Sequence, residues 1–369
     1  MISSYPTVHC GVSRYTRELI SGLRNNHIEV FTYRMFFYYE WFSYFLIWPR
    51  LFLGILRIKP DILHIQYTPT ICGPFLPTLI AFIRASKPKT RIVITAHEKP
   101  SVYLKKFPRV VGYLFRLYEK SIYIMADKIL VHTSEHKQEL TNKYRISDAH
   151  VLVIPFGINE ARKVDAGQVQ DIRREYALDG KQVVTFFGTI RANKGIEYLI
   201  QSFSAVIKNK DNMGLLIAGG ALKAWSGYLD GLKLMVDKLD MKEHVKFTGF
   251  IEEADIPAIM NTSKIIVLPY TDITQSAVLY QDALAYARPV IVTDVGDLGR
   301  VVEQNHIGLV VPPRDIDSLN EAIVNLVSNE QKLRVCQDNE IRMQREFSWD
   351  SISKLHARIY DNTLLPLCS

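Results

Sequence analysis

Short apolar runs alternate with helical patterns along almost the whole chain, and this alternation limits the possible folds more than any other feature. In the first half the runs occupy residues 30–33, 61–67, 91–97, 128–132 and 151–154. A second series occupies residues 183–188, 214–219, 245–248, 265–268, 289–292 and 309–311. Strands separated by helices form parallel sheets whose crossover helices cover both faces. The sequence therefore predicts an α/β protein with two Rossmann-like, doubly wound parallel-sheet domains.

Length and charge also favour two domains. The chain has 369 residues, of which 48% are apolar and 22% charged, as in globular proteins that are too long for a single core. Residues 1–160 contain 21 Lys and Arg against 11 Asp and Glu, a net charge of +10, whereas residues 161–369 contain 24 against 27, a net charge of −3. Two parts of opposite charge suggest domains with different partners, and the basic part suits an anionic one.

The cysteines and the first residues indicate a cytoplasmic protein. Cys10, Cys72, Cys336 and Cys368 are scattered and form no C-x-x-C pair, so neither a disulfide framework nor a zinc site is expected. Residues 1–6 lack the basic and apolar regions of a signal peptide. We expect reduced thiols and a cytoplasmic location.

One segment is unusually rich in aromatic residues. Between residues 31 and 52, 12 of 22 residues are aromatic, and Glu40, Pro49 and Arg50 interrupt the run. These interruptions argue against a spanning helix, whereas dense Tyr and Trp next to Arg and Lys are typical of interfacial segments. We expect peripheral contact with the inner face of the cell membrane through residues 31–58 and the basic first domain. An aromatic-rich core helix is the alternative.

The stretch from residue 269 to residue 299 combines a strand end, a polar loop and a helix start. The helix is expected to begin at residues 274–276 and to run to Ala287. Such a helix start has unpaired backbone N–H groups and the positive end of the helix dipole, and both favour the binding of a phosphate group. An ordinary helix cap has the same pattern, so this stretch alone leaves both interpretations open.

A second loop carries two cations at the end of a predicted strand. Gly188 permits a tight exit from the strand, and Arg191 and Lys194 follow before the next helix. Two cations three residues apart can clamp a diphosphate and stabilise it as a leaving group. Solvated loop charges are the alternative.

Three positions in the first half are further candidates. Gly11 lies between a short strand and a helix, where the backbone can approach a ligand closely. His64 and His97 lie near the carboxyl ends of predicted strands, where open α/β sheets bind their ligands. Because a single histidine is more often structural, each remains a candidate on this ground alone.

Together, these motifs resemble those of the family 4 glycosyltransferases, retaining enzymes with the two-domain arrangement called GT-B. The resemblance covers essentially the whole chain and rests on the order and spacing of short motifs. In the first half they are Ser3-Ser-Tyr-Pro6 with Gly11, His64-Ile-Gln-Tyr67, Thr95-Ala-His97 and Ile154-Pro-Phe-Gly157. In the second half they are Phe187-Gly188 with Arg191 and Lys194-Gly195, Phe247-Thr-Gly249, Asp282-Ala-Leu-Ala285, Pro289-Val290 and Thr293-Asp-Val-Gly296.

The resemblance implies a division of the chain into three parts. Residues 1–160 would form an acceptor-binding domain and residues 161–346 a nucleotide-sugar-binding domain, and the two would face a central cleft. Residues 347–369 would form a C-terminal helix that packs back on the first domain.

The resemblance also implies roles for individual residues. Arg191 and Lys194 would bind the donor diphosphate, and His97, the third predicted catalytic residue, would approach the transferred sugar. Gly11 would lie close to donor and acceptor, and the backbone near residues 250–251 would hold the nucleobase. The remaining donor-binding positions are Gly188, Phe250, Ile251, Thr274, Gln275, Ser276, Ala277, Val278 and Asp282.

The chain departs from the family's acidic pair, which has the pattern E-x7-E. The second acid falls on Asp282, which can still accept hydrogen bonds from two ribose hydroxyls, whereas the first falls on Thr274. Residues 275–277 read Gln-Ser-Ala where the commonest pattern is Gly-Phe-Gly, and they look closest to a branch with Gln-Ser-Gly-Val. The family is thought to use departure and attack on one face without a protein nucleophile, so a missing Glu need not abolish the chemistry.

The leading hypothesis is a retaining hexosyltransferase that uses a UDP- or GDP-sugar and a lipid-linked or polysaccharide acceptor in cell-envelope glycan synthesis. No cofactor and no metal are expected, because no Asp-x-Asp pair lies in a suitable loop and the two cations can neutralise the diphosphate. A non-catalytic GT-B subunit that binds a partner glycosyltransferase is the alternative, and a nucleotide-sugar epimerase is a third. No nucleic-acid-binding motif accompanies the basic residues.

Overall fold

The chain forms two compact units in the computed structural model, which describes residues 1–3, 11–34, 41–69, 75–98, 108–272 and 278–365. Unit 1 comprises residues 1–157 and 349–369, and unit 2 comprises residues 158–348. Each unit contains one six-stranded sheet, and the strand pairs within both sheets are parallel. The predicted α/β class with two parallel-sheet domains is confirmed.

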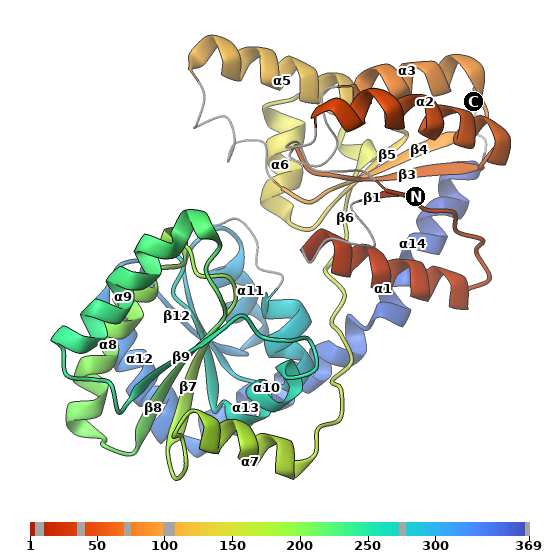
Figure 1. Ribbon diagram of the computed structural model, residues 1–369. Helices are drawn as coiled ribbons and strands as arrows, with labels where there is room; N and C mark the ends of the chain where they lie inside the picture. Colours follow the sequence, from red (N-terminus) through yellow and green to blue (C-terminus); the bar gives the residue numbers. More distant parts are fainter. Residues whose placement is uncertain (4–10, 35–40, 70–74, 99–107, 273–277, 366–369) are drawn as a thin grey trace. The chain divides into compact units, whose positions relative to one another are not determined.

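Unit 1 has the strand order β2-β1-β3-β4-β5-β6. Its strands are β1 (Ile2–Ser3), β2 (Tyr33–Arg34), β3 (Ile62–Tyr67), β4 (Arg91–Ala96), β5 (Lys128–Val131) and β6 (Val151–Val153). Helices α2, α3 and α5 lie along one face of the sheet, and α1 and α14 pack together on the other (Figure 1). The helices are α1 (Gly11–Asn25), α2 (Trp41–Ile58), α3 (Leu76–Ser86), α5 (Arg109–Ile124), α6 (Ser134–Asn142) and α14 (Trp349–Leu364).

Unit 2 has the strand order β12-β11-β10-β7-β8-β9, so the chain reverses its direction of travel across the sheet between β7 and β10. Ligands of open α/β sheets bind outside the carboxyl ends of the strands at such a switch point. The strands are β7 (Gln182–Phe187), β8 (Met213–Ala218), β9 (Val245–Gly249), β10 (Ile265–Leu268), β11 (Val290–Thr293) and β12 (Gly308–Val311). The helices are α7 (Ala166–Glu175), α8 (Ile196–Asn209), α9 (Ser226–Lys238), α10 (Ile256–Thr262), α11 (Leu298–Asn305), α12 (Ile316–Ser328) and α13 (Glu330–Glu346).

The apolar patterns explain these elements. All six residues of β8 are buried, as expected for a strand covered on both faces. In α8 the buried apolar residues recur at helical spacing and form one stripe that faces the core. They are Ile196, Leu199, Ile200, Phe203 and Val206.

The helix expected to run to Ala287 has a different form. Its described part is a π-helical turn, Leu279–Ala283, followed by a 3-10 turn, Leu284–Tyr286. Ala287 ends it in the left-handed region with φ 48°, and Pro289 disfavours helical backbone at the residue before it. The described part is therefore helical up to the expected end, but it is wound as π and 3-10 turns. Single π turns often occur at functional sites.

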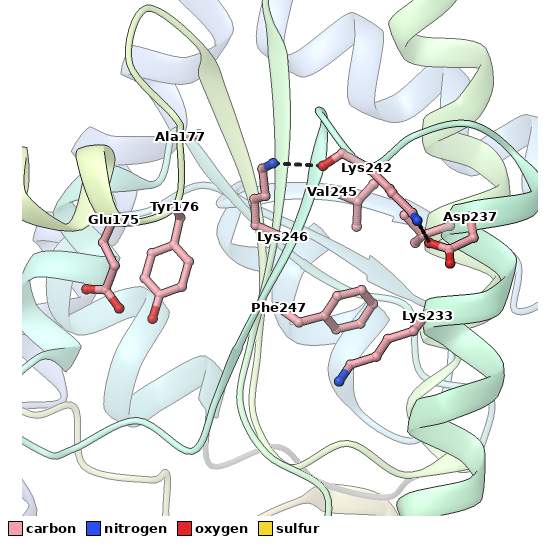
Figure 2. A pocket seen from close by; sticks show the side chains of 10 residues that line it. Glu175, Tyr176, Ala177, Lys233, Asp237, Lys242, Val245, Lys246 and Phe247 are labelled. Carbon is pink, nitrogen blue, oxygen red and sulfur yellow. Dashed lines mark hydrogen bonds and ion pairs between the residues drawn. The ribbon is translucent and has the colours of Figure 1, made fainter.

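A cavity of about 490 Å³ lies along the open edge of the unit 2 sheet, at β9. Figure 2 shows Phe247 of β9 directed toward Lys233 of α9, with Lys242 and Lys246 above them. Lys242 pairs with Asp237 at 3.2 Å, and Lys246 Nζ donates to the Lys242 carbonyl at 2.8 Å. Charged side chains at an open edge discourage pairing with another strand, and we assign that role to these lysines.

Unit 1 encloses a network of buried histidines near the carboxyl ends of its strands. His132 Nδ1 lies 3.0 Å from the Ile154 carbonyl, which can only accept, so Nδ1 carries the proton. His97 Nε2 lies 2.7 Å from Gln66 Oε1, which also can only accept, so Nε2 carries the proton of a neutral His97. His97 Nδ1 and His132 Nε2 then face each other at 3.3 Å without a proton, so the two neutral rings are in contact but share no hydrogen bond.

The same network holds α14 against the sheet. The His64 ring lies between Tyr360 of α14, at 2.5 Å, and Thr95 of β4, at 2.7 Å. His356 of α14 donates to the Ile352 carbonyl at 2.8 Å and leaves its other nitrogen 3.3 Å from the Tyr15 hydroxyl.

The buried histidines should make the protein sensitive to acid. Burial lowers the pKa of His132 to about 3 and that of His356 to about 4, and it lowers the pKa of His64 and His97 well below the usual value. Unfolded histidines titrate near ~6.5, so below that pH the unfolded chain binds more protons and stability falls. We predict a loss of roughly 1.4 kcal/mol per pH unit per histidine between about pH 6 and 4, measured by denaturant unfolding.

Two variants make this test specific. His356→Gln can still donate to a carbonyl and should remove one histidine's share of the pH dependence. His27, an exposed histidine with φ 60°, offers the control His27→Asn, which should leave the dependence unchanged. Equal pH dependence in wild type and His356→Gln would contradict the assignment.

Candidate functional site

The predicted site residues are divided between the two units. Gly11 and His97 belong to unit 1, and Thr274, Gln275, Ser276 and Ala277 lie outside the described residues. The described members in unit 2 are Gly188, Arg191, Lys194, Phe250, Ile251, Val278 and Asp282.

Gly188 brings the end of β7 next to the start of the π turn. Its φ of +133° is rarely adopted by other residues. A Cβ at this position would lie 3.5 Å from Val278 Cγ2, so the two predicted donor-binding positions are neighbours. A side chain on the adjacent Gly219 would meet the Gly188 carbonyl oxygen, which explains why both positions need glycine.

The loop after β7 is tied to the chain that leaves β10. Gly195 has φ +64°, and a Cβ there would collide with the Pro269 carbonyl oxygen. Thr271 N donates to the Asn193 carbonyl at 3.0 Å, and Asn193 Nδ2 donates to the Asp272 carbonyl at 3.1 Å. The loop that carries the two cations therefore lies against the first residues of the 269–299 stretch.

Lys194 is buried against an aromatic ring. Lys194 is the last residue of a 3-10 turn, Ala192–Lys194, and only 6% of it is exposed. Lys194 Nζ lies 3.7 Å from the centroid of the fully buried Tyr270 ring. Burial lowers the pKa of the Lys194 amine to about 7, and the Arg191 charge acts in the same direction.

Arg191 is the second cation of this loop, and its guanidinium is incompletely satisfied. Its Nε atom is buried without a hydrogen-bond partner, although buried polar groups are normally paired. In the part of the chain that the structure describes, neither Arg191 nor Lys194 forms an ion pair with a carboxylate. Two adjacent cations without an anion are suited to a phosphorylated ligand.

The residues that follow β8 and β9 contact each other at the carboxyl ends of these strands. The Phe250 ring packs on Gly220, where an added Cβ would come within 2.5 Å of ring carbons. Phe250 is nevertheless 70% exposed. An exposed aromatic face held on a glycine can stack on a planar group such as a nucleobase. Ile251 follows it and is half-buried.

The π turn supplies two buried polar residues. Asp282, predicted from the sequence, is 1% exposed. Gln281 is 2% exposed, and both of its amide atoms lack hydrogen-bond partners. Sequence analysis missed Gln281 and Tyr270. The sequence offered a signal for each: Gln281 is a polar residue within the mostly apolar run 277–285, and Tyr270 is an aromatic residue directly after Pro269.

The two candidates in unit 1 are placed less directly. Gly11 is the first residue of α1, and the residues before it lie outside the described part. His97 is 4% exposed, and both ring nitrogens already contact side chains, those of Gln66 and His132. Its contact with a transferred sugar stays a prediction, and His64 serves the internal network.

The described residues contain neither a candidate metal site nor a candidate membrane-spanning helix. No group of three or more His, Cys, Asp or Glu side chains there could hold a metal ion. Within the same residues, the helices are all too short or too polar to span a membrane.

Comparison with known families matches nearly the whole chain. Residues 10–162 match the model described as Glycosyltransferase Family 4, and residues 168–343 match the model described as Glycosyl transferases group 1. The two matches fall in consecutive parts of the chain and together include every described candidate residue.

Individual relatives are distant. Mannosylfructose-phosphate synthase of Agrobacterium fabrum is 26% identical over 68% of this chain and 56% of its own length. Alpha-D-kanosaminyltransferase of Streptomyces kanamyceticus is 22% identical over 64% of this chain and 61% of its own length. The chain thus spans less than two thirds of these relatives.

Solved structures share the fold. A glycosyltransferase from Rickettsia africae has a TM-score of 0.76 at 16% identity and covers 99% of this chain and 98% of its own. HepE of Anabaena, in complex with UDP-glucose, has a TM-score of 0.70 at 16% identity, with 93% and 88% covered. With both family models matched and the GT-B fold present, the chain belongs to the group 1, family 4 glycosyltransferases.

Proposed function

We propose that this protein transfers a hexose, with retention of configuration, from a nucleotide diphosphate sugar to a lipid-linked or polysaccharide acceptor of the cell envelope. The observation that carries the proposal is a pair of cations, the buried Lys194 and the half-buried Arg191, which lack an anionic partner among the described residues. A buried charge without a partner is unfavourable. A bound diphosphate would supply the missing negative charge.

The same pair would also assist the reaction. Negative charge builds up on the diphosphate as its bond to the sugar breaks, and cations fixed in advance stabilise that charge. Gly195 fixes the loop because any side chain there would strike the Pro269 carbonyl. With two cations in this position, neutralisation of the leaving group needs no metal.

The remaining contacts of the donor follow from the neighbouring residues. The exposed Phe250 ring on Gly220 would stack on the base, and the buried Asp282 would accept hydrogen bonds from the ribose hydroxyls. A UDP- or GDP-sugar is the donor that we propose. A similar protein of Mycobacterium tuberculosis is described as a GDP-mannose-dependent mannosyltransferase, and HepE was solved with UDP-glucose.

Retention would proceed without a protein nucleophile. Thr274 stands where the family's first acid lies, and neither a threonine nor the buried Asp282 is an obvious nucleophile for the sugar. We propose that departure and attack take place on the same face of the sugar. The substitution at residue 274 would then change recognition of the donor sugar and leave diphosphate binding intact.

We also propose that unit 1 contacts an anionic membrane surface, because α5 exposes an apolar stripe. Six large apolar residues of α5 are between 44% and 72% exposed: Val110, Val111, Tyr113, Leu114, Leu117 and Ile124. Leu53 of α2 and Phe82 of α3 are each 57% exposed on the same layer of helices (Figure 1). Arg109, Arg116 and Lys120 line the stripe, a pattern typical of helices that bind anionic lipid.

The sequence predicted this contact through residues 31–58 and the basic first domain. The side chains of residues 41–48 lie outside the described part, and the support comes mainly from α5. If unit 1 held the protein at the membrane, the protein and a lipid-linked acceptor would both diffuse in the plane of the membrane. We propose that this surface thereby makes their encounters more frequent.

A non-catalytic subunit remains the second candidate, favoured by Thr274 in place of an acid. Such a protein could bind a nucleotide but would turn over no donor. Turnover therefore separates the two candidates.

Removal of either cation should slow transfer. We predict that Arg191→Ala and Lys194→Ala each lower kcat for nucleotide release from the donor sugar by roughly 100-fold or more, as loss of one charge-stabilising donor does in other enzymes. The assay measures nucleotide release with UDP- and GDP-sugars and lipid-linked acceptors.

Lys233→Ala is the matched control, because Lys233 is a lysine of the same unit that lines the β9 cavity. Its kcat should equal that of wild type. If wild type releases no more nucleotide than the two site variants with any donor and acceptor, the enzymatic proposal is wrong.

The membrane surface has its own test. Leu114→Glu combined with Leu117→Glu places two negative charges on the α5 stripe, so cosedimentation with vesicles that contain anionic phospholipid should fall several-fold, and added salt should weaken wild-type binding. Leu234→Glu changes a leucine of α9 that is 54% exposed and should have no effect. Equal vesicle binding by wild type and the α5 variant would rule out this surface.

A further inference from the structure

Lys194 has an environment that does not suit a permanent positive charge. Among the described residues, the groups that act on its Nζ are the ring of Tyr270, just after β10, and the Arg191 guanidinium on its own loop. Residues 273–277, which follow β10, are Ile-Thr-Gln-Ser-Ala and contain no ionisable side chain. The aromatic face offers only partial compensation, and the guanidinium repels a second cation.

The carboxylates of the adjoining elements do not compensate for this charge. Glu197 of α8 accepts a hydrogen bond from the Tyr228 hydroxyl. Asp272 follows β10, and Asp282 lies in the π turn. Among the described residues, none of these three forms an ion pair with Lys194. A buried amine in such surroundings favours its neutral form.

Arg191 and Lys194 therefore differ in kind. A guanidinium keeps its proton under all ordinary conditions, whereas an amine loses it readily when buried. The pKa of Lys194, lowered to about 7, agrees with this geometry. At pH 8 the site would contain one fixed charge and one amine that is mostly neutral.

We propose that binding of the donor takes up one proton from solvent at Lys194 Nζ. The inference rests on the proposed function, because the diphosphate is what makes the ammonium form favourable. The lone pair of Nζ accepts a proton from water or buffer, and no bond of the donor breaks in this step. The ammonium ion then lies beside the diphosphate, and release of the nucleotide product returns the proton to solvent.

Proton uptake also makes donor affinity depend on pH. Above about pH 7 each further pH unit raises the share of neutral Lys194 in the free protein, so the Kd should rise, up to roughly tenfold per unit. The effect depends on the amine alone. A guanidinium at the same position would remove it.

Calorimetry tests the proposal directly. Binding of UDP-glucose and of GDP-mannose is measured at pH 8 in buffers that differ in ionisation enthalpy, and the slope of the observed heat gives the number of protons exchanged. Neither probe has a phosphate that titrates in this range. For the probe that binds, we expect uptake of about 0.9 proton by wild type, given a free pKa near ~7.

Three variants make the result specific. Lys194→Arg keeps the charge and should show no uptake and a Kd that stays flat between pH 7 and 8.5. Lys194→Met lacks both charge and proton and should bind more weakly without uptake. Lys233→Met, in the β9 cavity, should behave as wild type.

The possible outcomes distinguish failure of the proton-uptake inference from failure of the proposed function. Binding by wild type without proton uptake would overturn the inference and leave the proposed function in place, and so would uptake that persists in both Lys194 variants. Failure of wild type to bind any nucleotide sugar across a panel of bases would overturn the proposed function and the inference with it.

Discussion

Among the described residues no carboxylate pairs with the buried Lys194 or the half-buried Arg191, and the candidate site depends on this constraint. Arg191 and Lys194 are held in place because Gly195 packs its backbone on the Pro269 carbonyl and because Asn193 bonds to the chain leaving β10. Holding the two charges there lowers the stability of the free protein, because neither charge has a carboxylate partner among the described residues. A site of this kind makes the free protein less stable, but its cations are already in place when a diphosphate binds.

Unit 1 follows the opposite principle. Its buried histidines are held by neighbouring acceptors, His132 by the Ile154 carbonyl and His97 by Gln66 Oε1. These two hydrogen bonds fix the tautomers of the neutral rings at the carboxyl edge of the sheet. Unit 1 also leaves apolar side chains exposed, and several of them gather along α5.

The sequence was sufficient for most of the strands, the two parallel sheets and the loop with Arg191 and Lys194, because periodicity and local glycines encode them. The strand predicted at residues 30–33 was misplaced, since β2 is Tyr33–Arg34. It was insufficient for contacts between distant segments. His356 meets Tyr15 across 341 positions, and Tyr270 meets Lys194 from another strand. The π turn at Leu279–Ala283 also escaped prediction, because its apolar pattern is compatible with an ordinary helix. The exposed apolar face of α5 was not predicted either, because the sequence alone does not show which side of a helix the rest of the unit covers.

We propose above all that a nucleoside diphosphate binds at the carboxyl end of β7 in unit 2. The most direct measurement is the electron density of crystals of the whole chain grown with UDP or GDP. We predict diphosphate density in contact with Arg191 and Lys194, and a base against Phe250. Nucleotide density located instead at the β9 cavity, with Arg191 and Lys194 left without contact, would contradict it.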